Sequence, residues 1–291
     1  MLLDRLRSAK RIGFLFSGGS SRCIFQVGVV ETLLGFGVQP AMTLGVSAGA
    51  WNAAAVAVGN ARQLRAYWRF FCRMPHIDLG NLLREHSPFI WSRLHERAFN
   101  RYIGANAIQS PATLPLFVAL TRLRDRQRVI VDARTASDPF KLLLASNFLP
   151  PFYTHPIEID GERYGDGGWT DALPYENLIA AGCDAVVVMA SKGESEGGLY
   201  RNPDDYDHVI GDERVIVIRP RHRMPLGFTE RRWSKLSPMA DLGAFRAREV
   251  LLGERHAQCD VAARGIAPSA YVSAARQKLK RYFRPSAQPL T

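Results

Sequence analysis

The chain has 291 residues, of which 47% are hydrophobic, so it can bury a large core in one domain or two. Its four cysteines, Cys23, Cys72, Cys183 and Cys259, are far apart and form no C-x-x-C pair, which argues against a disulfide framework or a zinc site. The formal net charge of +11 is compatible with nucleic acid or anionic lipid as a partner, or with a generally basic protein, and says nothing of the fold.

The sequence gives no sign of a membrane anchor. Its apolar runs fall short of the roughly 20 residues that a membrane-spanning helix needs. Charges at Asp4, Arg5 and Arg7 interrupt the first residues before an apolar signal-peptide segment can form. We therefore expect a cytoplasmic protein that is soluble or peripheral on a membrane.

The first fifty residues alternate between strand and helix. Residues 12–16 are apolar and predict a buried strand, and residues 24–34 carry apolar side chains at helical spacing. A second strand, 42–46, leads into the small, apolar segment 48–59, which predicts a buried helix. This order of strand, turn and helix is typical of a parallel sheet wrapped by helices.

The rest of the chain predicts further elements. Residues 62–103 look helical and rich in aromatic residues, so they form either core or an apolar substrate groove or lid. The remaining expected elements are a hairpin of 114–120 and 129–131, a helix over 140–148, a hairpin of 157–159 and 162–164 around Asp160-Gly161, strands 185–189 and 215–218, and helices over about 240–263 and 269–283. No linker or repeat interrupts this order, so we expect a single domain over 1–291, with a helical, basic extension over about 220–291.

A G-x-S-x-G pentapeptide, Gly45-Val46-Ser47-Ala48-Gly49, lies between the second strand and the helix after it. Glycines two residues before and after the serine allow the strand and helix to approach closely, so Ser47 would be presented on a sharp turn. The N-terminus of the following helix would face an anion that forms beside it. The same pentapeptide also occurs by chance in chains rich in glycine and alanine, so its surroundings must decide.

The turn Ser17-Gly18-Gly19-Ser20-Ser21-Arg22 follows the first strand. Its successive N–H groups predict an anion-binding loop, which in acyl transfer would be an oxyanion hole. Phosphate binding is the competing interpretation. It is disfavoured because the loop has neither the G-K-[ST] ending of a P-loop nor G-x-G-x-x-G spacing.

Asp166, in Asp166-Gly167-Gly168, is the candidate base for Ser47, although an Asp-Gly turn with no further role is the alternative. A Ser-His-Asp hydrolase would place its serine after more strands. The histidines of the second half, His155, His208, His222 and His256, have no strand-end or glycine-flanked setting. A Ser-Asp dyad is therefore the economical hypothesis, and the histidine triad stays as an alternative.

Four ordered blocks carry a resemblance: Gly18-Gly19-Ser20-Ser21-Arg22-Cys23, Gly45 to Gly49, Ala145-Ser146-Asn147-Phe148-Leu149-Pro150, and Asp166-Gly167-Gly168 with Pro174. Together they resemble the patatin-like phospholipase family over about residues 12–190. The resemblance implies a three-layer α/β/α fold with a mainly parallel central sheet. It also implies hydrolysis of carboxyl esters of lipids, phospholipids or acylglycerols, through an acyl-enzyme and without metal or cofactor.

Carried over by position, the resemblance implies roles for individual residues. Ser47 would be the nucleophile and Asp166 the general base, and the N–H groups of Gly18, Gly19 and Ser20 would form the oxyanion hole. Arg22 would orient that loop or meet lipid phosphate. Gly45, Gly49, Gly167 and Gly168 would shape the elbow and the turn beside the base.

Two positions depart from the family pattern, because Ser20 and Cys23 stand where the family has glycine. A serine adopts a positive φ only with strain, and the Cys23 thiol would narrow the site. The alternative to an active hydrolase is therefore a catalytically weak lipid-binding or scaffold protein.

The partners that we expect are a lipid substrate and an anionic membrane surface, and no nucleic acid. Basic and aromatic residues interleave over 276–284, which predicts either a surface helix that docks on anionic lipid or an ordinary solvated helix.

Overall fold

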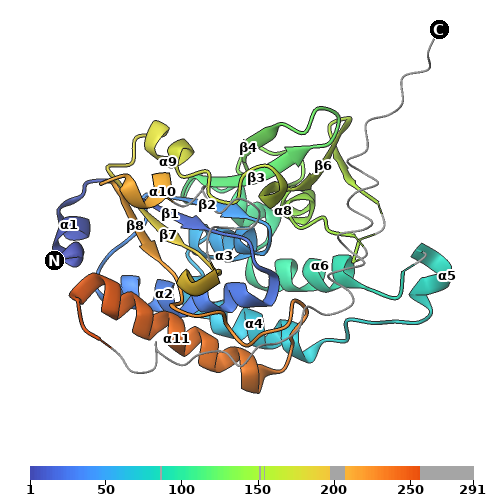
Figure 1. Cartoon of the computed structure of the whole chain (residues 1–291). Helices are drawn as coiled ribbons and strands as arrows, with labels where there is room; N and C mark the ends of the chain where they lie inside the picture. Colours follow the sequence, from blue (N-terminus) through green and yellow to red (C-terminus); the bar gives the residue numbers. More distant parts are fainter. Residues whose placement is uncertain (86, 151, 154, 197–206, 256–291) are drawn as a thin grey trace, which may run out of the picture.

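An eight-stranded sheet runs through the middle of the protein and has helices on both faces (Figure 1). The computed structural model describes residues 1–85, 87–150, 152–153, 155–196 and 207–255. The strands are β1 (Ile12–Phe16), β2 (Met42–Val46), β3 (Leu116–Arg122), β4 (Arg128–Asp132), β5 (Ile157–Ile159), β6 (Glu162–Asp166), β7 (Ala185–Met189) and β8 (Val215–Ile218).

The strand order is β5-β6-β3-β2-β1-β7-β8, with β4 paired to β3. The pairs β3·β2, β2·β1, β1·β7 and β7·β8 are parallel, whereas β4, β5 and β6 join antiparallel at one end. The mainly parallel sheet is thus confirmed, as are the two predicted hairpins. Asp160 and Gly161, at φ 50° and 79°, form the turn of the β5–β6 hairpin.

The central strands are mostly apolar because both faces of the sheet are covered. In β1, Phe14 and Phe16 point into the larger core and Leu15 points into the smaller one. All five residues of β1, β2 and β7 are buried. A continuous apolar run therefore indicated each of these strands correctly.

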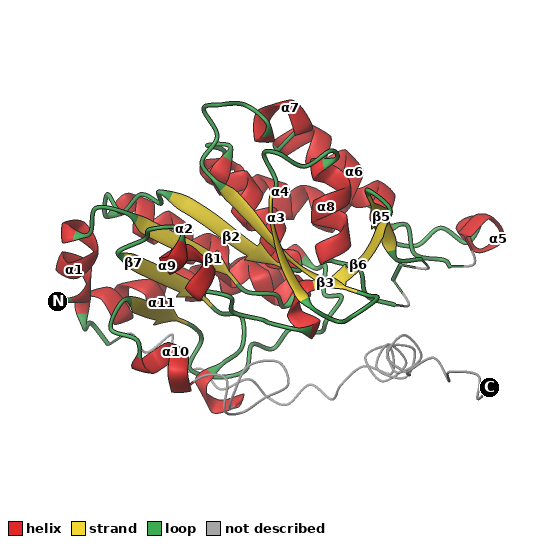
Figure 2. Cartoon of the chain, turned by 90° about the horizontal axis from the view of Figure 1, so that it is seen from above, coloured by secondary structure: helices red, strands yellow, loops and turns green. Residues whose placement is uncertain are grey.

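The helices divide between the two faces of the sheet (Figure 2). The larger core contains residues of α1 (Leu2–Ser8), α2 (Ile24–Gly35), α3 (Ala48–Ala57), α4 (Leu64–Arg73), α6 (Trp91–Tyr102), α7 (Ala105–Ile108), α8 (Pro139–Ser146) and α11 (Trp233–Leu252). The smaller core contains residues of α9 (Glu176–Ala180) and α10 (Asp207–Gly211). The three-layer α/β/α arrangement is therefore confirmed. No helix in the described part of the chain has both the length and the apolar content for a membrane crossing.

Two predicted helical regions have different bounds in the structure. Residues 62–103 form separate helices, α4, α5 (Asn81–Glu85) and α6, because the chain leaves helical geometry after Arg73. The predicted helix over about 240–263 was wrong at both ends. It begins at Trp233, with Pro238 tolerated inside it, and ends at Leu252 because Gly253 takes a left-handed cap at φ 74°. The predicted helix 269–283 lies outside the described residues.

Helix α11 packs directly on α2, and glycine makes the close crossing possible. A Cβ on Gly28 would overlap the Ala240 carbonyl oxygen, and one on Gly243 would overlap the Phe25 carbonyl oxygen. The residues after 220 therefore do more than extend the family core. Through α11 they cover the helix that follows the first strand.

The α2–α11 crossing leads to a stability prediction. Gly28→Ala should lower the free energy of unfolding by about 3 kcal/mol or more, because the methyl group has no space against backbone atoms. Urea unfolding at neutral pH measures the change.

Gly35→Ala is the matched control on the same helix, because no atom lies within 4 Å of the added Cβ. It should leave stability unchanged or raise it by up to about 1 kcal/mol. Equal effects of the two substitutions would contradict the close crossing.

Candidate active site

Ser47 lies where β2 turns sharply into α3. Its backbone is at φ 54° and ψ −133°, a conformation that L-residues rarely adopt, and it is the N-cap of α3. A Cβ on Gly45 would overlap Ala50, and one on Gly49 would overlap the Phe16 and Ser17 carbonyl oxygens. Both glycines thus stand at close approaches between strand, helix and the neighbouring loop.

Strand register brings Asp166 to Ser47. Val46 pairs with Ala119 of β3, and Asp166 pairs with Leu120 on the other side of that strand. The Ser47 hydroxyl donates to Asp166 Oδ2 at 2.6 Å, and both residues are buried, with 7% and 5% exposed. The N–H of Gly168 donates to the other carboxylate oxygen at 2.8 Å.

The turn after Asp166 is packed as tightly as the elbow. A Cβ on Gly167 would overlap the Ala119 carbonyl oxygen. The Asp166 carbonyl accepts from the Thr121 hydroxyl at 2.8 Å. The Asp-Gly-Gly turn therefore sets the direction of the carboxylate toward the elbow.

Two side chains at the end of α8 hold the backbone of Ser47. Ser146 Oγ accepts from the Ser47 N–H at 2.8 Å and donates to the Ala119 carbonyl at 2.8 Å. Asn147 Nδ2 donates to the Ser47 carbonyl at 2.9 Å. The sequence had marked Ser146 and Asn147 only as part of the resemblance. The structure shows what they contact.

The loop 17–22 crosses directly over Ser47. A Cβ on Gly18 would lie 2.9 Å from the Ser47 Cβ and 3.6 Å from its Oγ. The N–H groups of Gly18, Gly19 and Ser20 donate to no acceptor within the described residues. Three unpaired donors thus lie on the loop beside the hydroxyl.

Ser20 has a positive φ of 52°, the conformation that a serine adopts only with strain. The left-handed conformation costs a non-glycine residue about 1–2 kcal/mol. The hydroxyl of Ser20 donates to the Phe228 carbonyl at 2.7 Å, and that of Ser21 to the Gly227 carbonyl at 2.6 Å. These bonds tie the strained loop to a segment far along the chain.

Cys23 and Arg22 do not line the pocket beside Ser47. The Cys23 thiol is fully buried and donates to the Ser17 carbonyl at 3.4 Å, and burial raises its pKa far above the usual range. The expected narrowing of the site by this thiol was therefore wrong. Arg22 lies 3.7 Å from the Glu196 carboxylate, on the outside of the loop.

A buried amide network fixes the loop against the elbow helix. Gln26 Nε2 donates to the Ser17 and Met189 carbonyls, and its Oε1 accepts from Asn52. Asn52 also donates to the Cys23 carbonyl and accepts from Trp68 Nε1. Every polar atom of both amides is paired, so the network specifies one arrangement of α2, α3 and α4.

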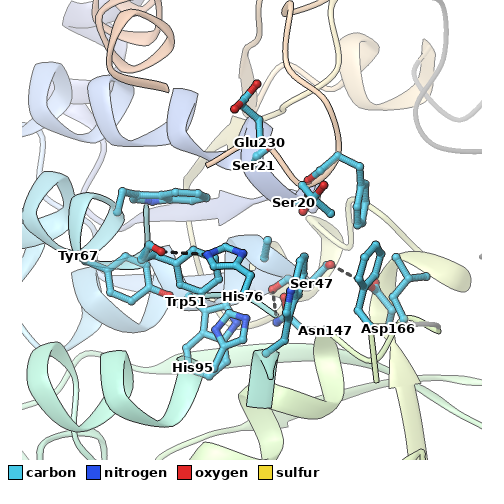
Figure 3. Close-up of a pocket in the computed structure, with 18 residues that line it drawn as sticks. Ser20, Ser21, Ser47, Trp51, Tyr67, His76, His95, Asn147, Asp166 and Glu230 are labelled. Atoms are coloured by element: carbon cyan, nitrogen blue, oxygen red, sulfur yellow. Dashed lines mark hydrogen bonds between the residues drawn. The ribbon is translucent and has the colours of Figure 1, made fainter. Parts of the chain in front are cut away.

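An apolar pocket of about 640 Å³, including its open mouth, leads to Ser47 (Figure 3). Its aromatic lining consists of Trp51, Tyr67, Trp68, Phe71, Trp91, Phe152 and Phe228. In Figure 3, Asp166 lies to one side of Ser47, and Trp51, His76 and His95 lie to the other. Of the aromatic residues in the region 62–103, Tyr67, Trp68, Phe71 and Trp91 line the pocket, whereas Phe99 and Tyr102 are buried in the core.

His76 and His95 line this pocket, and the sequence analysis missed both. His95 stacks on Trp51 with ring centroids 4.5 Å apart, and burial lowers its pKa to about 3. Its position one turn after Trp91 and one turn before Phe99 marks it as part of the buried aromatic face of α6. The exposed His155 and the half-buried His222 lie outside the pocket lining.

The Ser47 hydroxyl has no histidine partner among the described residues. Within the same residues, no three His, Cys, Asp or Glu side chains are arranged to hold a metal ion. The described geometry thus offers a serine, a carboxylate and free backbone donors.

Comparisons with known proteins show the family and the fold of the chain. The family model described as patatin-like phospholipase matches residues 14–179. An uncharacterized protein of Escherichia coli K12, YjjU, is 26% identical over 200 residues, which are 62% of this chain and 51% of YjjU. The chain thus spans about half the length of that relative.

The crystal structure of VipD from Legionella pneumophila shares the fold. It superposes with a TM-score of 0.51 at 12% identity and covers 94% of this chain and 74% of VipD. At this identity the likeness speaks for the fold alone.

The contacts of Ser146 lead to a prediction for the elbow. Ser146→Ala should lower the free energy of unfolding by about 1–3 kcal/mol, because the buried Ser47 N–H and Ala119 carbonyl both lose their partner. Urea unfolding gives the value. Ser137→Ala, at an exposed serine, is the control and should change it by less than about 0.5 kcal/mol. Equal small effects would mean that Ser146 does not support the elbow.

Buried His95 leads to a pH prediction. The unfolded chain binds a proton on this ring below about pH 6.5, whereas the folded protein does so only near pH 3. Stability is therefore lost as pH falls through this window, at a slope from this residue approaching about 1.4 kcal/mol per pH unit.

His95→Phe keeps the ring and removes the titration, so its free energy of unfolding should fall less steeply between pH 6 and 4.5. The exposed His155→Phe should keep the wild-type slope. Identical slopes for wild type and His95→Phe, from urea unfolding at several pH values, would refute the prediction.

Proposed function

Because the chain belongs to the patatin-like phospholipase family, we propose that it is a lipid acyl hydrolase that uses Ser47 as nucleophile and Asp166 as general base. One observation carries the proposal, the 2.6 Å hydrogen bond from the Ser47 hydroxyl to the Asp166 carboxylate at an aromatic pocket. The substrates are carboxyl esters of lipids, either phospholipids or acylglycerols.

In the acylation step, Ser47 Oγ attacks the ester carbonyl carbon while Asp166 takes the hydroxyl proton. The tetrahedral intermediate places its negative charge near the N–H groups of Gly18, Gly19 and Ser20, which have no other described acceptor. Collapse of the intermediate breaks the ester bond, and the leaving alcohol takes the proton from Asp166.

Deacylation repeats these steps with water. Asp166 takes a proton from the water as the water oxygen attacks the acyl carbon. Collapse of the second intermediate breaks the bond between the acyl carbon and Ser47 Oγ, and Asp166 returns its proton to Ser47 Oγ as the fatty acid leaves. The same donors stabilise both intermediates. The mechanism requires neither a histidine nor a metal ion.

The pocket supports a lipid substrate. Seven aromatic side chains contribute to its lining, and one of them, Trp51, lies one helical turn after Ser47 on α3. An acyl chain in this pocket would be in apolar contact from the carbonyl onward. Arg22, paired with Glu196 outside the pocket, would orient the oxyanion loop and not bind a phosphate within the pocket.

The strain at Ser20 favours a second candidate, a lipid-binding protein with little catalytic power. Ser20 keeps a positive φ and shares its loop with two of the proposed donors. An active-site-directed fluorophosphonate probe distinguishes the two functions, because only an activated Ser47 reacts with it. Labelling of wild type, absent in Ser47→Ala, supports the hydrolase, and absence of labelling in both supports the lipid binder.

The dyad predicts a specific pattern of activity loss. On short-chain nitrophenyl esters, Ser47→Ala and Asp166→Asn should each lower kcat/KM by about 10³-fold or more, because each removes a group that bonds or moves a proton in the transition state. Released nitrophenol gives the rate.

His155→Ala and His222→Ala, which lie outside the pocket, are the controls and should keep near wild-type rates. A large loss in either would favour a Ser-His-Asp triad. Equal activity of wild type and Ser47→Ala, on these esters and on phospholipid vesicles, would refute the hydrolase.

A further inference from the structure

Between two pocket-lining residues, His76 and Trp91, the chain leaves the body of the protein. Both views show α5, at the tip of this excursion, standing away from the rest of the described protein (Figures 1 and 2). The excursion has a paired stem. The N–H of Ile90 donates to the His76 carbonyl at 3.1 Å, and that of Asp78 to the Pro88 carbonyl at 2.9 Å.

The stem is anchored to the pocket wall. Trp91 stacks on Phe152 at 4.5 Å, and Phe89 packs against the same ring at 5.0 Å. Asn81 is fully buried, and its amide donates to the Ser87 and Phe89 carbonyls at 3.0 Å each. The excursion is therefore held at its base and folded over a buried side-chain amide.

Its outer surface is apolar. Ile77, Leu79, Leu82 and Leu83 are 54%, 76%, 49% and 88% exposed, and we call these four side chains the α5 knob. The other large apolar side chains that are exposed in the described chain are Met1, Leu2 and Ile210. These lie on or beside α1 and α10, on the opposite side of the molecule in both views.

Three exposed basic side chains lie close to the two ends of the excursion, at His76 and Trp91. Arg73 at the end of α4, Arg93 in the first turn of α6 and Arg231 beside the pocket are all exposed. Two acidic side chains in this region have partners, since Asp78 accepts from the Gly80 N–H and Glu230 pairs with Arg232. An apolar tip above a cationic base is the pattern of a segment that enters an anionic lipid surface.

We infer that the α5 knob inserts into an anionic lipid surface and thereby places the mouth of the pocket against the layer that holds the substrate. The inference rests on the proposed lipid hydrolase function. A protein partner fits less well, because a stable protein interface needs about 20–30 residues a side, whereas four protruding side chains can be buried in lipid on their own.

The test compares two exposed sites. Leu79→Ser combined with Leu83→Ser removes the two most exposed side chains of the knob, and Ile210→Ser, at a 55% exposed residue, is the matched control. Binding is measured by co-sedimentation with vesicles of equal parts phosphatidylglycerol and phosphatidylcholine. Hydrolysis is measured on those vesicles and on a soluble short-chain nitrophenyl ester.

The double variant should bind these vesicles about 100-fold more weakly, roughly tenfold for each leucine that no longer enters the lipid. Hydrolysis of vesicle lipid should fall in parallel, while hydrolysis of the soluble ester stays at the wild-type rate, because neither leucine lines the pocket. Ile210→Ser should match wild type in all three assays. All variants keep the basic segment 276–284, so any contribution of this segment to vesicle binding is the same in each variant.

Vesicle binding by the double variant equal to that of wild type would overturn the inference and leave Ser47-dependent ester hydrolysis untouched. A wild-type dimer that becomes a monomer in the double variant, with unchanged vesicle binding, would also overturn it and make the knob a self-association surface. Failure of the proposed function is a different result, in which wild type hydrolyses neither substrate while binding still reports on the knob.

Discussion

The backbone of Ser47 is held in a conformation that costs an L-residue about 1–3 kcal/mol, and contacts with the surrounding structure offset this cost. Ser146 bonds its N–H, Asn147 bonds its carbonyl, and α3 begins at the next residue. The glycines on either side let these groups come close enough to act. Without such support the chain would relax and the hydroxyl would leave the end of the strand.

The same arrangement depends on residues beyond the family match at 14–179. Ser191 Oγ donates to the Gly18 carbonyl, and its N–H donates to Ser17 Oγ at 3.0 Å. The hydroxyls of Ser20 and Ser21 are held by carbonyls at 228 and 227. The loop over Ser47 therefore takes its shape from three separate parts of the sequence.

Much of this was predictable from the sequence, for local reasons. The buried strands β1, β2, β7 and β8 are short apolar runs, and the pairing of Ser47 with Asp166 followed from two glycine-bounded turns. The sequence analysis missed His76, His95 and the α5 knob. The sequence pattern of an amphipathic, aromatic helix is the same whether the helix lines a cavity or fills a core. The sequence predicted a helix over about 240–263, whereas α11 begins at Trp233 and ends at Leu252. The prediction missed both ends because Pro238 is tolerated inside the helix and Gly253 caps it, and both effects depend on the exact position of the residue in the helix. The supports of the loop are contacts between distant segments, which no local pattern encodes.

The close crossing of Gly28 on Gly243 has a consequence for the order of biosynthesis. Helix α2 emerges from the ribosome early, yet the part of its surface around Gly28 is covered by α11, near the end of the described chain. The loop over Ser47 likewise cannot form its hydrogen bonds with Ser191 and with the carbonyls at 227 and 228 until those residues have been made. Contacts between segments so distant in sequence form late in folding. A nascent chain that already carries both Ser47 and Asp166 thus still lacks the residues that hold the loop over Ser47, and that loop can take its described shape only once residue 228 has been made.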